Sequence, residues 1–152
     1  MMVIQIRTGE NNFNALGLFS TIFYSLSFNL QPEFFMMKKV YYLSSCSTCI
    51  RILKEANLNQ NFELQDIKTN KITTQQIEQM QKLAGSYESL FSRRAIKYKS
   101  MGLKNQNLAE DDYKKLILEE YTFLKRPVVV IDNQIFIGNS AKTVAALKAI
   151  TR

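Results

Sequence analysis

Two cysteines separated by two residues are the strongest chemical signal in this sequence, in the motif Cys46-Ser47-Thr48-Cys49. Cysteines at this spacing are typical of a redox pair or of one half of a metal site. The chain has no histidine and no third cysteine, which excludes a Cys/His zinc site and any His-dependent nucleophile within one chain. The motif therefore indicates thiol–disulfide chemistry, with two ordinary buried cysteines as the alternative.

The residues around the motif predict a strand followed by a helix. Residues 39–43 are a β-branched and aromatic run typical of a strand, and residues 50–58 place apolar side chains on one helix face. Cys46 then lies at the helix N-terminus, where free N–H groups and the helix dipole stabilise a thiolate. We expect Cys46 to be the more exposed nucleophile with the lower pKa, and Cys49 to be the resolving thiol.

The remaining patterns predict an α/β domain in the order β-α-β, three helices, β-β-α. A strand over residues 62–67 would complete a βαβ unit of about 30 residues. The elements that follow are helices over 74–83, 87–101 and 107–121 (the last from an Asn107-x-x-Glu110 capping box), strands over 128–131 and 134–137 around an Asp132-Asn133 turn, and a helix over 141–150 capped by Ser140.

The first 36 residues differ in character from the rest of the chain. They are poor in charge and show no regular period, whereas the regular patterns begin beside Met36-Met37-Lys38-Lys39. We interpret residues 1–36 as a disordered or non-native leader and residues 37–152 as the folded domain. A signal or anchor and a genuine extra element are the alternatives, but the apolar part is short and polar for a membrane span.

The charge of the chain suggests an anionic partner. The 152 residues carry a net charge of +7, and because residues 1–36 carry −1, the domain carries +8. Such a balance suits an oxyanion, glutathione, an acidic protein surface or nucleic acid. A solvated lysine-rich surface is the plainer interpretation, since the cations are spread along the chain and alternate with acids.

Three segments in order resemble the arsenate reductase ArsC/Spx family of thioredoxin-like proteins over residues 37–150. The first is the loop Leu43-Ser-Ser-Cys46-Ser-Thr-Cys49, and the second is Phe91-Ser-Arg-Arg94 followed by Met101-Gly-Leu103. The third is Phe123-Leu-Lys-Arg126-Pro127-Val-Val-Val130, followed by Ile137-Gly138-Asn139. The resemblance implies a thioredoxin-like fold with a central helical insertion.

The resemblance also implies roles for single residues. Cys46 matches the family's nucleophile, and Pro127 matches a cis-proline that faces the cysteine loop. Arg126 matches an arginine that stabilises an oxyanion or the thiolate, and Arg94 or its neighbour Arg93 resembles a second such arginine. A solvated helix face is the alternative for Arg93 and Arg94.

The sequence departs from the arsenate reductases at three places. Tyr42 and Ile50 stand where the family has a histidine and an arginine around the nucleophile, with Arg51 one place late. A third arginine is missing at Phe136-Ile-Gly138 in the last hairpin. Because fewer guanidinium groups hold a doubly charged anion less well, arsenate is expected to be a poor substrate.

Three functions follow as hypotheses. The first is a thiol–disulfide oxidoreductase without a bound cofactor or metal, acting on a small oxyanion or thiol substrate and reduced by glutathione, thioredoxin or glutaredoxin. The second is an Spx-like redox regulator that binds RNA polymerase, because members of that branch carry a C-x-x-C switch. The third is a family member without a redox role. We expect a cytoplasmic protein with no membrane segment and no direct nucleic-acid contact.

Overall fold

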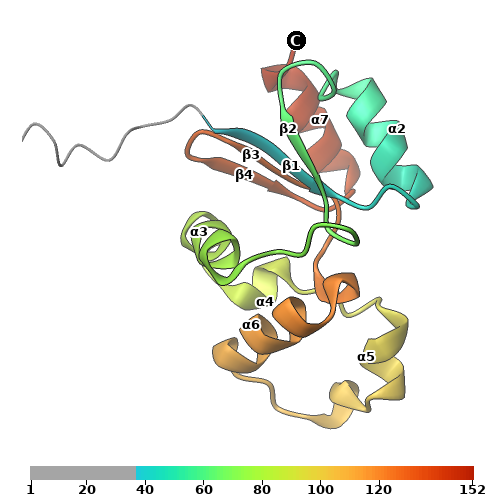
Figure 1. The fold of residues 1–152 in the computed structure, drawn as a ribbon, viewed down its shortest axis with the longest axis vertical. Coiled ribbons are helices and arrows are strands. Elements are labelled where there is room, and N and C mark those ends of the chain that lie inside the picture. Colours follow the sequence, from blue (N-terminus) through green and yellow to red (C-terminus); the bar gives the residue numbers. More distant parts are fainter. Residues whose placement is uncertain (1–36) are drawn as a thin grey trace, which may run out of the picture. The chain divides into compact units, whose positions relative to one another are not determined.

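The structure is a computed structural model that describes residues 37–152, so the expected leader over residues 1–36 lies outside the described residues. Figure 1 shows the domain as a sheet with helices packed against it. The elements are β1 (Lys38–Tyr42), α2 (Ser47–Glu55), β2 (Glu63–Asp66), α3 (Thr74–Ala84), α4 (Tyr87–Leu90), α5 (Ile96–Ser100), the 3₁₀ turn η1 (Leu103–Asn105), α6 (Glu110–Glu119), the 3₁₀ turn η2 (Tyr121–Phe123), β3 (Val128–Ile131), β4 (Gln134–Ile137) and α7 (Ala141–Ile150).

The four strands form one mixed sheet in the order β2-β1-β3-β4. β1 and β2 are parallel because α2 returns the chain between them, whereas β3 pairs antiparallel with both β1 and β4. The β3–β4 hairpin turns at Asp132, whose φ of 51° lies in the left-handed region that aspartate tolerates. Both the βαβ unit and the hairpin were predicted, which confirms the α/β fold class.

Side chains that alternate along the strands fill two separate apolar cores. Val40 and Val129 pack with α2 and α7 on one face of the sheet, against residues such as Leu147. Tyr41 and Val128 point to the other face, where α3, α4 and α6 lie (Figure 1). This alternation follows from the two-residue period of a strand, and it places a helical layer on each face of the sheet.

The predicted helix over residues 87–101 is wrong, because two short helices, α4 and α5, stand in its place. Backbone groups there bond across to the segment before β3: the Ser92 N–H donates to the Phe123 carbonyl at 2.6 Å, and the Lys125 N–H donates to the Leu90 carbonyl at 2.8 Å. Phe91 is buried and stacks on Phe123 with ring centroids 5.0 Å apart. These long-range contacts replace helical bonds, so the insertion holds four α-helices instead of three.

Helix caps explain where the longer helices begin. Thr73 caps α3 by accepting from the Gln76 N–H, and Ser140 caps α7 by accepting from the Thr143 N–H, as predicted for Ser140. The predicted Asn107-x-x-Glu110 box is wrong, because the Asp112 carboxylate accepts from the Ala109 N–H at 2.9 Å. α6 therefore begins at Glu110, two residues later than a cap at Asn107 requires.

Candidate functional site

Cys46 lies in the loop between β1 and α2, directly before the first residue of the helix. Its backbone is extended, with φ of −95° and ψ of 106°, and its N–H donates to the Leu43 carbonyl at 3.0 Å. Its own carbonyl accepts from the Ile50 N–H at 3.1 Å. These two bonds hold the sulfur at the helix N-terminus, where the Thr48 and Cys49 N–H groups donate to it.

The environment of Cys46 favours its thiolate. Burial raises the pKa of this thiol, but hydrogen bonds from the backbone and thiol of Cys49 and from the Thr48 N–H, together with the charge of Arg126, outweigh burial. The pKa of Cys46 is therefore lowered from its ordinary value. Because the thiolate is the form of cysteine that attacks, this environment suits the nucleophilic role expected of Cys46.

Cys49 has the opposite character. It is fully buried, whereas Cys46 is only half-buried, and the two are free thiols in the structure. Burial raises the pKa of Cys49 to about 11, and the hydrogen bond and negative charge of Cys46 add to that rise. Cys46 is the more exposed of the two cysteines, as predicted, and the two pKa shifts have the directions that the sequence led us to expect.

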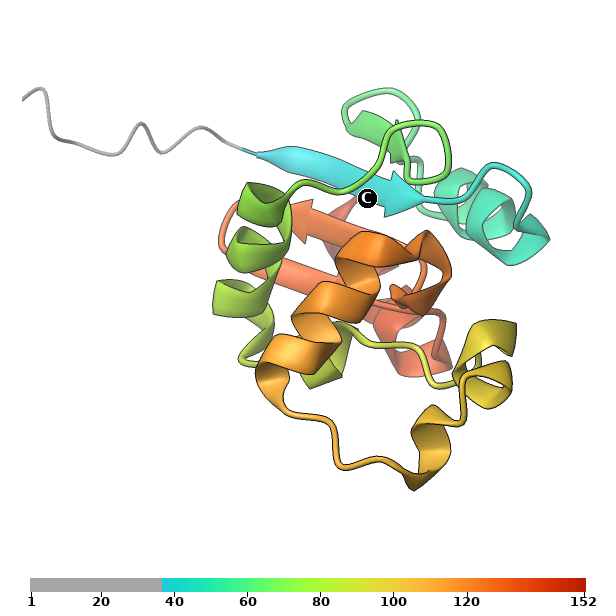
Figure 2. The same cartoon turned by 60° about the horizontal axis from the view of Figure 1, so that its bottom comes forward.

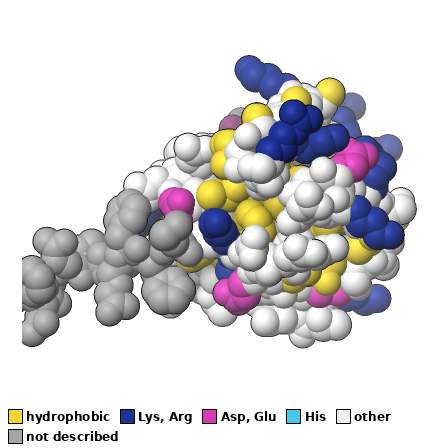
Figure 3. Space-filling view, turned by 90° about the horizontal axis from the view of Figure 1, so that it is seen from above, with side chains coloured by type: hydrophobic (Ala, Val, Ile, Leu, Met, Phe, Trp, Pro, Cys, Tyr) yellow, Lys and Arg dark blue, Asp and Glu magenta, His cyan; other side chains and the backbone are white. Residues whose placement is uncertain are grey.

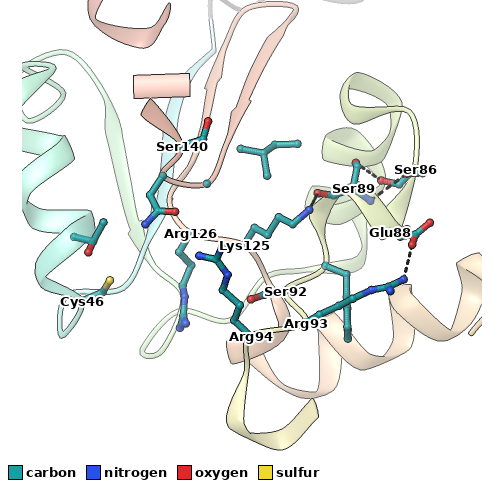
Figure 4. A pocket seen from close by; sticks show the side chains of 15 residues that line it. Cys46, Ser86, Glu88, Ser89, Ser92, Arg93, Arg94, Lys125, Arg126 and Ser140 are labelled. Atoms are coloured by element: carbon teal, nitrogen blue, oxygen red, sulfur yellow. Dashed lines mark hydrogen bonds and ion pairs between the residues drawn. The ribbon is translucent and has the colours of Figure 1, made fainter. Parts of the chain in front are cut away.

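A cavity of about 800 Å³ opens in front of Cys46. Figure 4 shows Cys46 and Arg126 at one end, Glu88 and Arg93 at the other, and Arg94 between them. The lining residues come from the loop before α2, from α4 and the segment after it, and from the two ends of the β3–β4 hairpin: Cys46, Thr48, Ser86, Glu88, Ser89, Phe91, Ser92, Arg93, Arg94, Lys125, Arg126, Ile137, Gly138, Asn139 and Ser140.

Arg126 is held beside the cysteines by the chain around it. Its peptide bond to Pro127 is cis, as the resemblance implies. The Nη1 atom of Arg126 is buried and has no hydrogen-bond partner within residues 37–152. Its positive charge helps to lower the pKa of Cys46 and opposes the rise in the pKa of Cys49. A buried donor without a partner, next to a thiolate, is suited to hold an anion that enters the cavity.

The two neighbouring arginines on the far wall differ from each other. Arg93 donates to Glu88 at 2.6 Å and to the Tyr113 hydroxyl at 3.1 Å. The bond to Tyr113 is the main reason that the pKa of Arg93 is raised, and the charge of Glu88 adds to that rise. Arg94 is exposed, and within the described part of the chain it has no carboxylate partner within ion-pair distance. Arg94 is therefore the better candidate of the two for binding an anion.

The structure also accounts for the places where the sequence departs from the arsenate reductases. Arg51 pairs with Glu55 at 2.8 Å on the outer side of α2 and does not line the cavity. In the last hairpin, Ile137 and Gly138 line the wall where the resemblance leads one to expect an arginine. The cationic residues of the cavity are therefore Arg93, Arg94, Arg126 and Lys125.

Sequence reasoning missed several lining residues. Lys125 donates to the Ser89 carbonyl at 2.8 Å, so its ammonium ties the strand segment to α4 instead of pointing freely into the cavity. Asn139 and Ser92 offer neutral polar groups on two walls. All three lie within the segments that resemble the family, but polar residues in loops are too common for these to be singled out from the sequence.

We searched residues 37–152 for a metal site and for a membrane-spanning helix as well. Within residues 37–152, no group of three or more cysteines and carboxylates lies close enough to bind a metal ion. Within the same range, no helix is both long and apolar enough to cross a membrane.

The fold and the cysteine site together define a thioredoxin-like protein with a helical insertion. The sequence model of the ArsC family matches residues 41–147, which is more than half of the chain, so this chain belongs to the ArsC family. A search among curated proteins found no significant match.

Several solved structures have the same fold. An ArsC-family related protein of Bacteroides fragilis shares 21% identity at a TM-score of 0.64, with 74% of this chain and 98% of that one covered. An arsenate reductase from Vibrio cholerae shares 18% identity at a TM-score of 0.62, covering 74% and 98%. The protein SACOL0876 of Staphylococcus aureus shares 25% identity at 0.61, covering 72% and 97%. The likeness at these identities is one of fold.

Proposed function

We propose that this protein is a thiol–disulfide oxidoreductase of the arsenate reductase type, with Cys46 as nucleophile and Cys49 as resolving thiol. One observation carries the proposal: a half-exposed thiol with a lowered pKa faces a cationic cavity, and a buried second thiol lies one helical turn behind it. Membership of the ArsC family supports the same chemistry.

In the first step the Cys46 thiolate attacks a sulfur of an oxidised substrate. A bond forms between Cys46 Sγ and that sulfur, and the substrate's own disulfide bond breaks to release a thiolate. Arg126 stabilises negative charge here, because its Nη1 atom is buried and free to donate. Arg94 is exposed on the same cavity and can bind an anionic group of the substrate.

In the second step the thiolate of Cys49 attacks Cys46 Sγ. The mixed disulfide breaks, the second half of the substrate leaves as a thiolate, and a Cys46–Cys49 disulfide forms, so that two electrons have passed to the substrate. The Cys46 thiolate helps to keep the pKa of Cys49 high. Once Cys46 is covalently bound, that negative charge is gone, so Cys49 becomes easier to ionise when it is needed.

Arsenate is a poor substrate in this proposal. Among the cationic residues that line the cavity in the described part of the chain, Arg126 and Arg94 are free for a compact dianion. Arg93 is already paired with Glu88, and Lys125 donates to the Ser89 carbonyl. Each charge-assisted hydrogen bond contributes about 1.5–3 kcal/mol, so the lack of one lowers oxyanion affinity by about tenfold or more.

The reductant that restores the dithiol is glutathione, thioredoxin or glutaredoxin, with no cofactor bound to the chain itself. A pair that must return to the dithiol form works in a reducing compartment, which favours the cytoplasm.

The test is mass spectrometry after mild peroxide, beside an arsenate-reduction assay with glutathione/glutaredoxin and with thioredoxin supplied separately. We expect an internal Cys46–Cys49 disulfide and slow arsenate turnover, because Cys49 captures an oxidised Cys46 before external glutathione reaches it. A glutathione adduct on Cys46 without an internal disulfide, together with fast arsenate turnover, would contradict the proposal. A disulfide that alters binding to RNA polymerase would favour the Spx-like regulator instead.

A further inference from the structure

The segment that follows the cavity wall is unusually basic. Residues 89–109 contain five cations and no acid: Arg93, Arg94, Lys97, Lys99 and Lys104. Within the described part of the chain, Arg93 pairs with Glu88 and Lys97 pairs with Glu120, whereas Arg94, Lys99 and Lys104 have no carboxylate within ion-pair distance. Figure 3 shows that Lys and Arg side chains also gather on the face of the domain that is seen from above, with a few acidic side chains among them.

An exposed isoleucine lies in the middle of this basic segment. Ile96 is 87% exposed, the highest value among the large hydrophobic residues described, and Met101 at the end of α5 is 47% exposed. Ile96, Lys99 and Ser100 share one face of α5 because they are three and four residues apart, whereas Tyr98 is buried on the opposite face. We call Ile96, Lys99 and Ser100 the α5 face.

The α5 face adjoins the redox cavity. Arg94, two residues before Ile96, lines the same cavity as Cys46. Figures 1 and 2 both show α5 on the same side of the domain as the N-terminus of α2. A protein bound to the α5 face would therefore lie on the side of the domain where the cavity lined by Cys46 and Arg94 opens.

We propose that the α5 face is the docking surface for an acidic protein that carries a dithiol and reduces the Cys46–Cys49 disulfide. This inference rests on the proposed function. Charge complementarity favours an acidic partner, and the exposed Ile96 supplies an apolar centre of the kind that protein interfaces bury. A small patch is sufficient, since redox proteins meet through small, transient interfaces.

Reduction of the Cys46–Cys49 disulfide takes two electrons, so the partner must supply two thiols. Its first thiolate attacks Cys46 Sγ, because Cys49 is fully buried, and the Cys46–Cys49 bond breaks to release Cys49 as a thiolate that takes up a proton. The partner's second thiolate then attacks the partner's own sulfur and releases Cys46. The partner loses two electrons and ends as a disulfide, while this protein regains both thiols.

The test measures reduction of the oxidised full-length protein by two acidic dithiol proteins, a thioredoxin and a glutaredoxin, each with its own recycling system. In the double variant Ile96→Ser/Lys99→Glu we expect kcat/KM for the protein reductant to fall by about tenfold or more, mainly through KM. Reduction by dithiothreitol, which needs no docking, stays unchanged. The matched control is Lys71→Glu/Ile150→Ser, which changes one exposed lysine and one exposed isoleucine away from the cavity and should behave as wild type.

Two outcomes overturn the docking surface while the proposed function stands. One is equal reduction of variant and wild type by the protein reductants, and a loss of duplex DNA binding in the same variant would then assign the basic face to nucleic acid instead. The other is no reduction by either protein although dithiothreitol works. If no Cys46–Cys49 disulfide forms at all, the proposed function fails and the docking surface falls with it. Circular dichroism shows whether the variant is folded, and Lys99→Glu alone gives a milder version of the same test.

Discussion

The cysteine loop and the helical insertion contribute to the same cavity by different means. Cys46 is activated mainly by groups close to it in sequence, the N–H groups of Thr48 and Cys49. The insertion contributes Arg93 and Arg94, whose places depend on contacts between segments far apart in the chain. The reactivity of the Cys46 thiol thus depends mainly on residues next to it in the sequence, whereas the binding of a substrate's anionic group depends on tertiary packing. We therefore expect substitutions to change one of these properties without the other.

The largest effect is expected where the local chemistry is removed. Cys46→Ser should lower the rate of disulfide reduction by at least about a thousandfold, because no other described thiol reaches the cavity. Cys49→Ser is the matched control, which should still form the mixed disulfide and then stop. Turnover rates and the intact mass of the protein distinguish the two variants. A Cys46→Ser protein that still reduces the substrate's disulfide would show that Cys46 is not the nucleophile.

The insertion is expected to depend most on its aromatic cluster. Phe91 is buried against Tyr98, Tyr113 and Phe123, with centroids 5.0–5.9 Å apart. Phe91→Ala should lower the free energy of unfolding by about 3–5 kcal/mol, measured by urea denaturation. A loss below about 1 kcal/mol would mean that the cluster does not hold the insertion. In the same variant with urea absent, the alkylation of Cys46 should change little if reactivity is local.

Substitutions of the two neighbouring arginines, Arg93 and Arg94, should have different effects on substrate binding. Arg94→Gln removes a guanidinium without a described acidic partner, so KM for an anionic substrate should rise about tenfold with little change in kcat. Arg93→Gln removes a cation already paired with Glu88 and should raise KM less. Equal effects of the two substitutions would show that the Glu88 pair does not withdraw Arg93 from the site.

A smaller effect is expected from Arg126, whose charge acts on the cysteine loop and which lines the same cavity as the arginines of the insertion. Arg126→Gln should raise the pKa of Cys46, so alkylation near neutral pH should slow by a few-fold, measured in a Cys49→Ser background. Because the folded pKa of Cys46 is lowered, thiolate reactivity is present above that pKa and is lost as the pH falls through it. Arg51→Gln, outside the cavity, is the control that should leave the pH profile unchanged. A Cys49→Ser protein that titrates at about 8.5 or above, like an unperturbed thiol, would refute local activation.

The smallest effect is expected outside both regions. We propose that a protein beginning at Met37 is as stable as the full chain, because the regular patterns of the sequence begin there. Thermal melting compares the two proteins directly. A midpoint several degrees lower in the shorter protein would show that residues 1–36 contribute to stability.

Local patterns were enough to predict much of the structure. The β1–α2 junction, the β3–β4 hairpin and the Ser140 cap each depend on residues within one or two turns of chain, so the sequence alone determined them. The lowered pKa of Cys46 followed largely for the same reason, since the N–H groups at a helix N-terminus stabilise the thiolate in front of it. The raised pKa of Cys49 comes mainly from its burial, which depends on how the domain packs.

Only the tertiary structure decided the break after α4 and the different environments of the two arginines. Residues 87–101 have a helical pattern, but Ser92 and Lys125 complete backbone hydrogen bonds between segments more than 30 residues apart. No local pattern encodes such a partner. The same holds for Arg93 and Arg94, which are adjacent and chemically identical in the sequence. They differ because Glu88, five residues earlier, and Tyr113, from α6, both lie beside Arg93. The place of Tyr113 results from how α6 packs against this part of the chain.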